Sequence, residues 1–283
     1  MSLVKHAASA RAAEWEAAGL DWLRVEDGAA VVDVVAVDGN NLVLQQLSPI
    51  QPSVSDAEDF GRALAATHAA GAAGYGAGPD EWSGDGFQGP ADDLLPLPLV
   101  PYDSWGAMYA DVRLAPLLEQ LAQLAGSSAA LSSREARAAY RRVPEERSQA
   151  GRVPEERSGG GVSRPAEPLL KRLHDGEFDE SCTAPARLHG DLWSGNVLWT
   201  ADGAVLIDPA AHGGHPESDL AALALFGAPH LERILASYNE IAPLADGWRD
   251  RIPLMQLHLM LLHAVLFGGG YVEQAEHILR RYR

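Results

Sequence analysis

In the first quarter of the chain, some segments space their apolar residues as a β-strand does and others as an α-helix does. Residues 2–5 form a short apolar strand, and residues 9–24 carry apolar side chains along one side at helical spacing. Two β-branched runs, 31–37 and 41–47, flank a turn of Asp, Gly and Asn, which predicts a β-hairpin. After a linker rich in Pro and Ser, apolar residues recur every four positions over 56–70. This order predicts a small β-rich segment followed by helices.

The rest of the pattern is mainly helical. Apolar stripes predict a long helix over 103–125, a short helix over 166–174 and a buried helix over 254–267. Two short apolar strands, 197–199 and 204–207, are separated by an Ala-Asp-Gly turn and predict a second hairpin. We therefore predict an α+β fold with a hairpin set into a helical body.

One segment has no apolar pattern to bury. Residues 142–148 read Arg-Val-Pro-Glu-Glu-Arg-Ser and recur as residues 152–158, and three glycines follow. Two copies are too few for a solenoid, and their composition offers almost nothing to a core. We predict a mobile surface loop over about residues 141–163.

The charge balance narrows the classes of partner. The 283 residues include 22 Lys and Arg against 39 Asp and Glu, which gives a net charge of −17. Such a surface repels the phosphates of nucleic acids and anionic membranes. The longest apolar run is too short and too polar to span a bilayer, and the single cysteine, Cys182, excludes an internal disulfide. We predict a soluble cytoplasmic protein that binds neither nucleic acid nor membranes, and we predict no particular oligomeric state.

Candidate chemistry is concentrated in residues 188–209. Asn196 enters the second predicted hairpin and Asp208 leaves it, so antiparallel pairing brings these two side chains together. Asp191 lies shortly before Asn196 in a loop. Carboxylate and amide oxygens suit Mg²⁺, which usually keeps several waters and bridges substrate phosphates. We assign Asn196 and Asp208 as metal ligands and Asp191 as the base that accepts a proton from a hydroxyl.

Two other interpretations use the same residues. Aspartates that cap helices beside a hairpin would need neither metal nor substrate. A metal-dependent hydrolase would bind zinc or manganese without nucleotide, through His189, Asp191, Asp208, His212 and His215. The ordered spacing His-x-Asp-x-x-x-x-Asn, then a hairpin, then Asp favours phosphoryl transfer, because that chemistry needs neutralised phosphates and an oriented hydroxyl.

Four short motifs carry a resemblance to a known family. They are His189-Gly-Asp-Leu-Trp-Ser-Gly-Asn196, Ile207-Asp-Pro-Ala210, Gly214-His-Pro-Glu-Ser-Asp-Leu-Ala221 and Leu266-Phe-Gly-Gly-Gly-Tyr271. These motifs resemble the signatures of the fructosamine (ketosamine-3-) kinases, relatives of aminoglycoside and choline kinases in the protein-kinase-like superfamily. The resemblance implies phosphorylation of a sugar hydroxyl on a small ketosamine or glycated amine, with ATP and Mg²⁺ as cofactors.

The resemblance also implies a nucleotide site in the first part of the chain. Lys5 ends an apolar strand and Glu16 lies in the following helix, which is similar to the kinase pair that holds the α- and β-phosphates. Gln45 and Leu47 lie at the end of the last strand before the linker, where the family places the backbone contacts to adenine. We expect these four residues to bind the nucleotide.

Two further residues are assigned to the acceptor substrate. Trp193 lies between the base and a metal ligand, where its indole is placed to stack on a sugar, with a packed core tryptophan as the alternative. His263 matches a family position near the sugar, with a core histidine as the alternative. Val265 replaces an Asn that is common in the family, so the acceptor sugar is not fixed by the resemblance.

Polar residues around the motif are given structural roles. Ser218 and Asp219 precede an apolar stretch over 220–226 and are predicted to cap that helix. We expect His189 to brace the catalytic loop by hydrogen bonding and His68 to be structural rather than a ligand.

The resemblance implies a two-lobed, protein-kinase-like fold. We place a reduced N-terminal β lobe at residues 1–48 and a mainly helical C-terminal lobe at residues 49–283. Because four residues precede Lys5, we expect the small lobe to lack the first two strands and the loop that cover the nucleotide phosphates in the family. The alternative function is therefore a pseudokinase, a binding module that has lost its nucleotide lid and its turnover.

Overall fold

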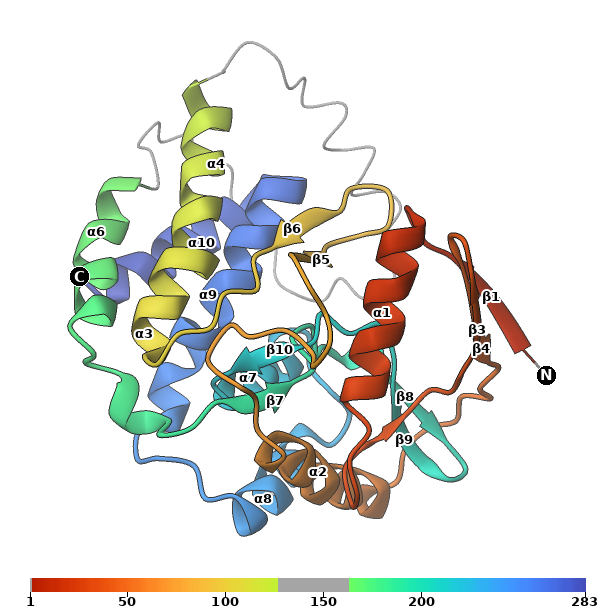
Figure 1. The fold of residues 1–283 in the computed structure, drawn as a ribbon. Helices are drawn as coiled ribbons and strands as arrows, with labels where there is room; N and C mark the ends of the chain where they lie inside the picture. The colour runs from red at the N-terminus through yellow and green to blue at the C-terminus, as the bar shows by residue number, and fades with distance from the viewer. Residues whose placement is uncertain (1, 127–162) are drawn as a thin grey trace.

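The computed structural model describes residues 2–126 and 163–283 of the chain. Figure 1 shows a small β-rich part at the N-terminus, drawn in red, beside a larger part built mainly from helices. The repeated segment that was predicted to be a mobile loop falls outside the described residues. Among the helices of the described ranges, none is long and apolar enough to cross a membrane.

The N-terminal part is a three-stranded antiparallel sheet with one helix against it. Its strands are β1 (Ser2–His6), β4 (Asn41–Gln45) and β3 (Val34–Asp38), in the order β1-β4-β3. The predicted hairpin is confirmed: β3 and β4 pair in antiparallel register up to Asp38 and Asn41, and Gly39 supplies the positive φ of the turn. Helix α1 (Ala10–Trp22) begins at Ser9, whose side chain accepts from the backbone of the first turn.

The prediction of one strand over 31–37 is wrong, because the apolar run is divided between two sheets. Residues Ala30–Val31 form β2, which pairs in parallel with β9 (Gly203–Leu206), whereas β3 begins only at Val34. Asp33 lies at the break, where its exposed carboxylate pairs with Arg24 at 3.0 Å. A charged residue is suited to this position between the two sheets, because its side chain stays in solvent.

The second predicted hairpin is confirmed and joins the two parts of the molecule. Strands β8 (Val197–Thr200) and β9 pair in antiparallel register, and β2 adds a third strand on the far side of β9. A continuous core runs across this junction, through Leu20, Leu42, Leu64 and Leu206. Burial of these side chains holds the hairpin against both parts, since each contributes roughly 1.5–3 kcal/mol of transfer free energy.

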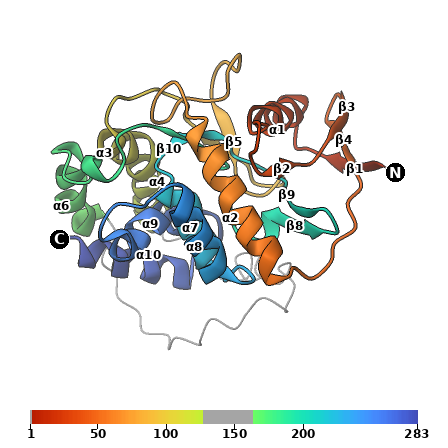
Figure 2. The same ribbon diagram turned by 90° about the horizontal axis from the view of Figure 1, so that it is seen from below.

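The C-terminal part is a set of packed helices (Figure 2). Both views place α2 and α8 side by side beneath the sheet region, whereas α9 and α10 lie on the side away from the N-terminus. The predicted helices over 56–70, 166–174 and 254–267 are all present, within a few residues at their ends. The bounds are α2 (Val54–Ala69), α6 (Ser163–His174), α7 (Glu217–Leu225), α8 (Leu231–Ile241), α9 (Trp248–Phe267) and α10 (Gly270–Arg281).

The predicted helix over 103–125 contains an interruption. It comprises α3 (Trp105–Met108), a wider π-helical turn over Tyr109–Leu114, and α4 (Ala115–Gly126). Within that turn the guanidinium of Arg113 is fully buried and donates to the carbonyl of Pro98 at 2.8 Å. Burial lowers the pKa of Arg113 to about 10. An amphipathic stripe does not reveal such a turn, because the apolar spacing before and after it stays helical.

Candidate active site

The loop that carries Asp191 is held between two short strands. It follows β7 (Ala186–Leu188), which pairs with β10 (His212–Gly214), and it leads directly into β8. Gly190 allows the loop to turn: its φ is +82°, and an added Cβ would lie 2.1 Å from the carbonyl oxygen of Ala210. The loop therefore packs against the chain just after Asp208.

The carboxylate of Asp219 holds the backbone of this loop. The prediction that Asp219 caps a helix is wrong. Its carboxylate, only 1% exposed, accepts from the backbone N–H groups of His189 at 2.7 Å and Gly190 at 3.0 Å. The ring of His68 lies 3.2 Å from the same carboxylate. Burial alone would raise the pKa of Asp219, but these hydrogen bonds outweigh it and hold the pKa below the usual value. The carboxylate thus stays charged and fixes the loop backbone.

Ser218 is likewise not a cap, because α7 begins at Glu217 after Pro216, with no side-chain cap. The structural role predicted for His68 is confirmed: its ring connects Asp219 with the hydroxyl of Tyr238, at 2.9 Å, on α8. The sequence cannot distinguish an aspartate that caps a helix from one whose side chain points into the core, because both lie at the start of a helix.

His189 braces the same loop, as predicted. Its Nδ1 accepts from the backbone N–H of Asp191 at 3.3 Å, and its Nε2 donates to the carbonyl of Ile207 at 2.8 Å. These partners require the neutral ring, and burial lowers the pKa of His189 accordingly. The imidazole therefore ties the loop to the end of β9.

The structure brings Asp191, Asn196 and Asp208 together. The buried amide nitrogen of Asn196 donates to Asp191 Oδ2 at 3.0 Å and to the Asp191 backbone carbonyl at 2.8 Å, and it lies 3.4 Å from the carbonyl of Asp208. Because the nitrogen makes these contacts, the amide oxygen of Asn196 is the atom left to bind a cation. Convergence through the hairpin is what the sequence predicted.

The environment of Asp191 suits a group that exchanges protons. Burial raises the pKa of its carboxyl group to about 7, against the opposing effect of the Asn196 hydrogen bond; the charge of Asp208 adds to the rise. A carboxyl group with a pKa near neutrality can take a proton and release it again. Leu192, fully buried beside it, fixes the loop in the core.

Asp208 lies in a backbone conformation that few residues adopt. Its φ is +55°, in the left-handed region, where aspartate is among the more tolerated side chains. The side chain is 42% exposed, and Oδ1 lies 2.9 Å from the Nζ of Lys5. The turn thus directs the carboxylate away from the core and toward the N-terminal sheet.

Lys5 joins that sheet to the motif. Its Nζ lies 2.7 Å from Glu16 Oε2 as well as 2.9 Å from Asp208, so two carboxylates share one ammonium group. Burial alone would lower the pKa of Lys5, but the charges of Asp208 and Glu16 outweigh it and raise the pKa. The structure therefore places Lys5 and Glu16 together at the motif, 11 residues apart in sequence.

Glu16 is the buried member of this group. Burial raises its pKa to about 7, opposed by the charge of Lys5 and reinforced by that of Asp208. Its second oxygen, Oε1, has no hydrogen-bond partner within the described residues. Helix α1 reaches this position because Gly19 lets it approach Pro209 and Ala211, where an added Cβ would lie 3.2 Å from each side chain.

Trp193 and His263 approach the same aromatic side chain. The ring centroids of Trp193 and Phe226 are 5.7 Å apart, and those of Phe226 and His263 are 5.8 Å apart. Sequence reasoning missed Phe226, which follows the last residue of α7 and has no periodic pattern around it. Trp193 also lies flat over Gly195, where an added Cβ would be 2.2 Å from the indole.

Gln45 and Leu47 lie farther along the sheet. Gln45 ends β4 and pairs with Ser2, while Lys5 pairs with Leu42 on the same strand. Leu47 packs against the core that connects the two parts. Their assignment to adenine stays a prediction.

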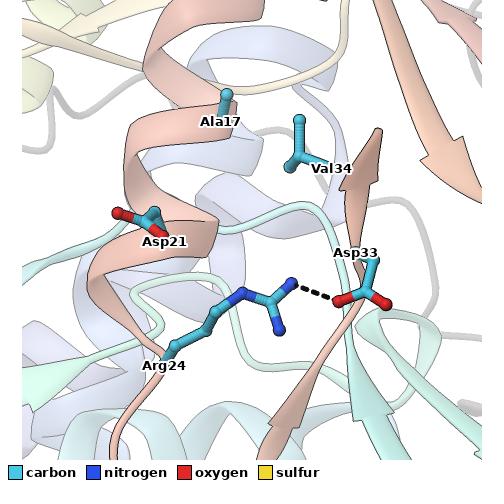
Figure 3. A pocket seen from close by; sticks show the side chains of 5 residues that line it. All are labelled: Ala17, Asp21, Arg24, Asp33 and Val34. Atoms are coloured by element: carbon cyan, nitrogen blue, oxygen red, sulfur yellow. Dashed lines mark ion pairs between the residues drawn. The ribbon is translucent and has the colours of Figure 1, made fainter. Parts of the chain in front are cut away.

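A cavity of about 590 Å³ lies outside this site, on another face of α1 (Figure 3). It is lined by Ala17, Asp21, Arg24, Asp33 and Val34, and the Arg24–Asp33 ion pair crosses it. Asp21 and Asp33 face it together with a single arginine, and it includes none of the predicted site residues. This cavity is therefore separate from the candidate site.

The five residues of the hydrolase interpretation do not form one metal centre. His212 Nδ1 donates to the Ala210 carbonyl at 2.8 Å, whereas the ring of His215 contacts Ser181 at 2.8 Å and accepts from Glu217 N. Within residues 2–126 and 163–283, no three His, Cys, Asp or Glu side chains are arranged to hold a metal ion. These imidazoles have structural partners instead.

Comparison with known proteins identifies the family of this arrangement. The chain matches the family model described as fructosamine kinase over residues 3–283. The chain belongs to the fructosamine kinase family. A Thermus thermophilus protein named as a ketoamine kinase is 30% identical over 257 residues, which cover 91% of this chain and 77% of that relative.

Other relatives agree with that membership. A crystal structure from Thermobifida fusca, named as a fructosamine-3-kinase, has a TM-score of 0.74 and 42% sequence identity, covering 95% of this chain and 79% of that chain. An Enterococcus faecium protein named as a ketoamine kinase is 43% identical over 99 residues, so the match spans only 35% of that relative's length. The predicted α+β, protein-kinase-like fold is confirmed by this crystal structure and by the similar fold of a macrolide 2'-phosphotransferase from Brachybacterium faecium, with a TM-score of 0.52 and 16% identity.

Proposed function

We propose that this chain transfers the terminal phosphoryl group of ATP to a sugar hydroxyl of a ketosamine. The observation that carries the proposal is a continuous set of charged and polar side chains, from Glu16 and Lys5 through Asp208 to Asn196 and Asp191. This set combines a cation, oxygen ligands and a base at one place. Membership of the fructosamine kinase family supports the acceptor class.

Asp191 accepts the proton of the acceptor hydroxyl in this mechanism. As the hydroxyl oxygen forms its bond to phosphorus, the bond from phosphorus to the leaving diphosphate breaks, and the proton moves to the Asp191 carboxylate. The hydrogen bond from Asn196 orients that carboxylate. A pKa of about 7 allows Asp191 to take the proton and later release it to solvent.

The residues present fit a magnesium ion. The amide nitrogen of Asn196 is turned toward Asp191, which leaves its oxygen for a cation. The same nitrogen also lies 3.4 Å from the backbone carbonyl of Asp208, whose carboxylate is 42% exposed. These are the hard oxygen donors that Mg²⁺ prefers. When bound, the ion neutralises charge on the phosphates. Asn196 and Asp208 hold it in this proposal.

Lys5 supplies positive charge where the phosphates lie in this proposal. Its ammonium group contacts both Asp208 and Glu16. Glu16 can keep Lys5 oriented when Asp208 turns to a cation. The nearby end of β4, with Gln45 and Leu47, is our proposed adenine contact, in a small lobe that we place at residues 1–48. A cytoplasmic location, where ATP is abundant, fits this activity.

A turnover assay tests the proposal. We expect ADP release from Mg-ATP that depends on fructosyl-lysine or ribulosyl-lysine in the wild-type protein. Asp191→Asn is expected to lower the rate by on the order of 10²–10⁴-fold, the contribution of a general base. The matched control is Asp202→Asn, since Asp202 lies in the exposed turn between β8 and β9. No shift of the melting temperature with Mg-ATP, together with no phosphate transfer, would support the pseudokinase alternative instead.

A further inference from the structure

The first turns of helix α1 are attached to the C-terminal part by an arginine stacked on a tryptophan. The guanidinium carbon of Arg11 lies 3.6 Å from the centre of the Trp82 ring, and Arg11 Nη2 donates to the backbone carbonyl of Ser83 at 2.5 Å. Trp82 and Ser83 belong to the loop that precedes β5 (Gly86–Gln88). Side chains about 70 residues apart in the chain therefore hold two elements together.

A second tryptophan of α1 extends this contact. Trp15 is 3% exposed, its Nε1 donates to the carbonyl of Phe87 at 3.0 Å, and its ring centroid lies 5.2 Å from that of Trp82. Gly86 lies flat against the same indole, where an added Cβ would be 2.5 Å from the ring. A spacing of four residues places Arg11 and Trp15 on one face of α1. We call Arg11, Trp15 and Trp82 the α1 clamp.

The loop before β5 is folded around Trp82. The backbone N–H of Trp82 donates to the carbonyl of Pro79 at 3.1 Å, and its indole Nε1 donates to the carbonyl of Asp85 at 3.3 Å. Glu81 has a φ of +65°, a conformation that side chains other than Gly rarely adopt. Such a conformation persists when surrounding contacts hold it. The loop therefore presents Trp82 to α1 in a defined position.

The α1 clamp lies beside the residue that contacts Lys5. Glu16 follows Trp15 directly in the chain, and its Oε2 lies 2.7 Å from Lys5 Nζ. Lys5 in turn contacts Asp208 at 2.9 Å. A movement of α1 that separates Trp15 from β5 would carry Glu16 with it, because both residues belong to the same helix. The contact between Glu16 and Lys5 therefore depends on where the clamp holds α1.

The clamp acts at the more exposed end of α1. Leu20 and Leu23, at the C-terminal end, are fully buried in the core. At the other end, the side chains of Arg11 and Glu14 are 47% and 54% exposed. An exposed cation–π contact adds little to the stability of a whole protein. Loss of the Arg11–Trp82 stack should therefore free the first turns of α1 without unfolding the chain.

We propose that the stack of Arg11 on Trp82 is a positioning contact for the nucleotide site: it holds α1 against the loop before β5 and so keeps Glu16 on Lys5 before nucleotide binds. The inference rests on the proposed function, which places phosphates at Lys5. Arg11 and Trp82 do not touch the nucleotide. Without the stack α1 has other positions open to it, and the apparent affinity for nucleotide falls with the fraction of molecules that remain competent.

Calorimetry with Mg-ADP, in the absence of acceptor, tests the positioning role. Arg11→Met and Trp82→Leu should each weaken binding by about five-fold, the range of an exposed cation–π contact. Trp82→Phe keeps an aromatic face and should retain most of the affinity. The matched control is Arg249→Met, because Arg249 stacks on Trp248 at 4.2 Å at the start of α9. This variant should bind Mg-ADP as the wild-type protein does.

A double-mutant cycle separates positioning through Glu16 from a general loss of stability. In Glu16→Ala, Lys5 has lost its partner on α1, so the place of α1 no longer acts on Lys5 through that contact. Adding Arg11→Met to Glu16→Ala should therefore weaken Mg-ADP binding no further. Residues that act independently would instead show the same five-fold loss in both backgrounds, since their effects add in free energy.

The outcomes distinguish this inference from the proposed function. Equal Mg-ADP affinity of the wild-type protein and Arg11→Met, an equal loss in Arg249→Met, or a full loss that persists in Glu16→Ala would overturn the inference even in a protein that phosphorylates a ketosamine. A loss confined to the Arg11 and Trp82 variants, in a protein that binds Mg-ADP but transfers no phosphate, would support the clamp and overturn the proposed function. A wild-type protein that binds no nucleotide would overturn both.

Discussion

The contact between Trp193 and Gly195 shows how closely single residues are fitted in this site. The indole fills the space that any side chain at position 195 would need, and the same indole contacts Phe226, while the backbone N–H of Trp193 donates to the Asp191 carbonyl at 3.0 Å. Gly195 therefore leaves the space that the side chain of Trp193 occupies.

A methyl group at position 195 should disturb the site rather than the fold. In Gly195→Ala the new Cβ would lie 2.2 Å from the Trp193 ring, so the indole must move, and with it the loop whose backbone bonds Trp193 to Asp191. We expect kcat/KM to fall by about 10²-fold, as a misplacement of roughly 1 Å produces, with little change in the urea midpoint. The control is Gly270→Ala, because position 270 has open space around it. Equal loss of activity in both variants would contradict this account.

His215 provides a test of pH dependence at the residue scale. Its Nδ1 accepts from the backbone N–H of Glu217 and its Nε2 contacts Ser181, and burial lowers its pKa to about 3. Because the unfolded chain binds the proton at higher pH, the stability from His215 is present above its unfolded pKa and is lost as pH falls.

The expected size follows from that pKa difference. The free energy of unfolding of wild type relative to His215→Gln should decrease by about 2 kcal/mol between about pH 6.5 and pH 5. Urea unfolding of both proteins across this range measures it. A constant difference would show that His215 is not held neutral in the folded protein.

Helix α1 contacts both the N-terminal sheet and the chain just after Asp208. Glu16 on this helix reaches Lys5 on β1, while Gly19 packs against Pro209 and Ala211. A shift of α1 would therefore separate Lys5 from Glu16 and alter the contact of Lys5 with Asp208.

The two lysines of the chain allow a matched comparison. Mg-ATP should raise the melting temperature of the wild-type protein, since a ligand that binds the folded state stabilises it. Lys5→Met should lose most of that shift because the phosphates lose their cation. Lys171→Met should keep it, because Lys171 is exposed on α6, where it pairs with Asp175. A full shift in Lys5→Met would contradict the role of Lys5.

Helices and strands were predictable from the sequence where the spacing of neighbouring residues alone determines them. Both hairpins and the apolar helices followed from periodicity and turn residues. The division of 31–37 between two sheets did not, since it depends on pairing with β9, where Val31 lies opposite Leu206, far along the chain. The π-helical turn around Arg113 and the inward position of Asp219 also depend on tertiary contacts. Local propensity carries no information about such partners.

At the scale of the whole molecule, the site was predictable in part. Asp191, Asn196 and Asp208 lie on one hairpin and its approach, so sequence spacing alone brought them together. The contact of Lys5 with Asp208 crosses the molecule and was not predicted, because the family resemblance only paired Lys5 with Glu16. Phe226 gave no signal in the sequence, because only the fold brings it into contact with Trp193 and His263.

Charge at the molecular scale is consistent with this arrangement. The chain carries a net charge of −17, yet the proposed substrate is a polyanion. The site therefore needs locally concentrated positive charge, and Lys5 lies beside the two proposed metal ligands. An acidic surface also favours approach of a cationic acceptor.

The central claim is that this chain phosphorylates a ketosamine with Asp191 as the base. Mass spectrometry of the acceptor, after incubation of fructosyl-lysine with Mg-ATP and protein, tests it most directly. The account predicts an acceptor heavier by one phosphoryl group with the wild-type protein and with Asp202→Asn, and almost none with Asp191→Asn. An unmodified acceptor with the wild-type protein, or the same product yield with Asp191→Asn, would contradict it.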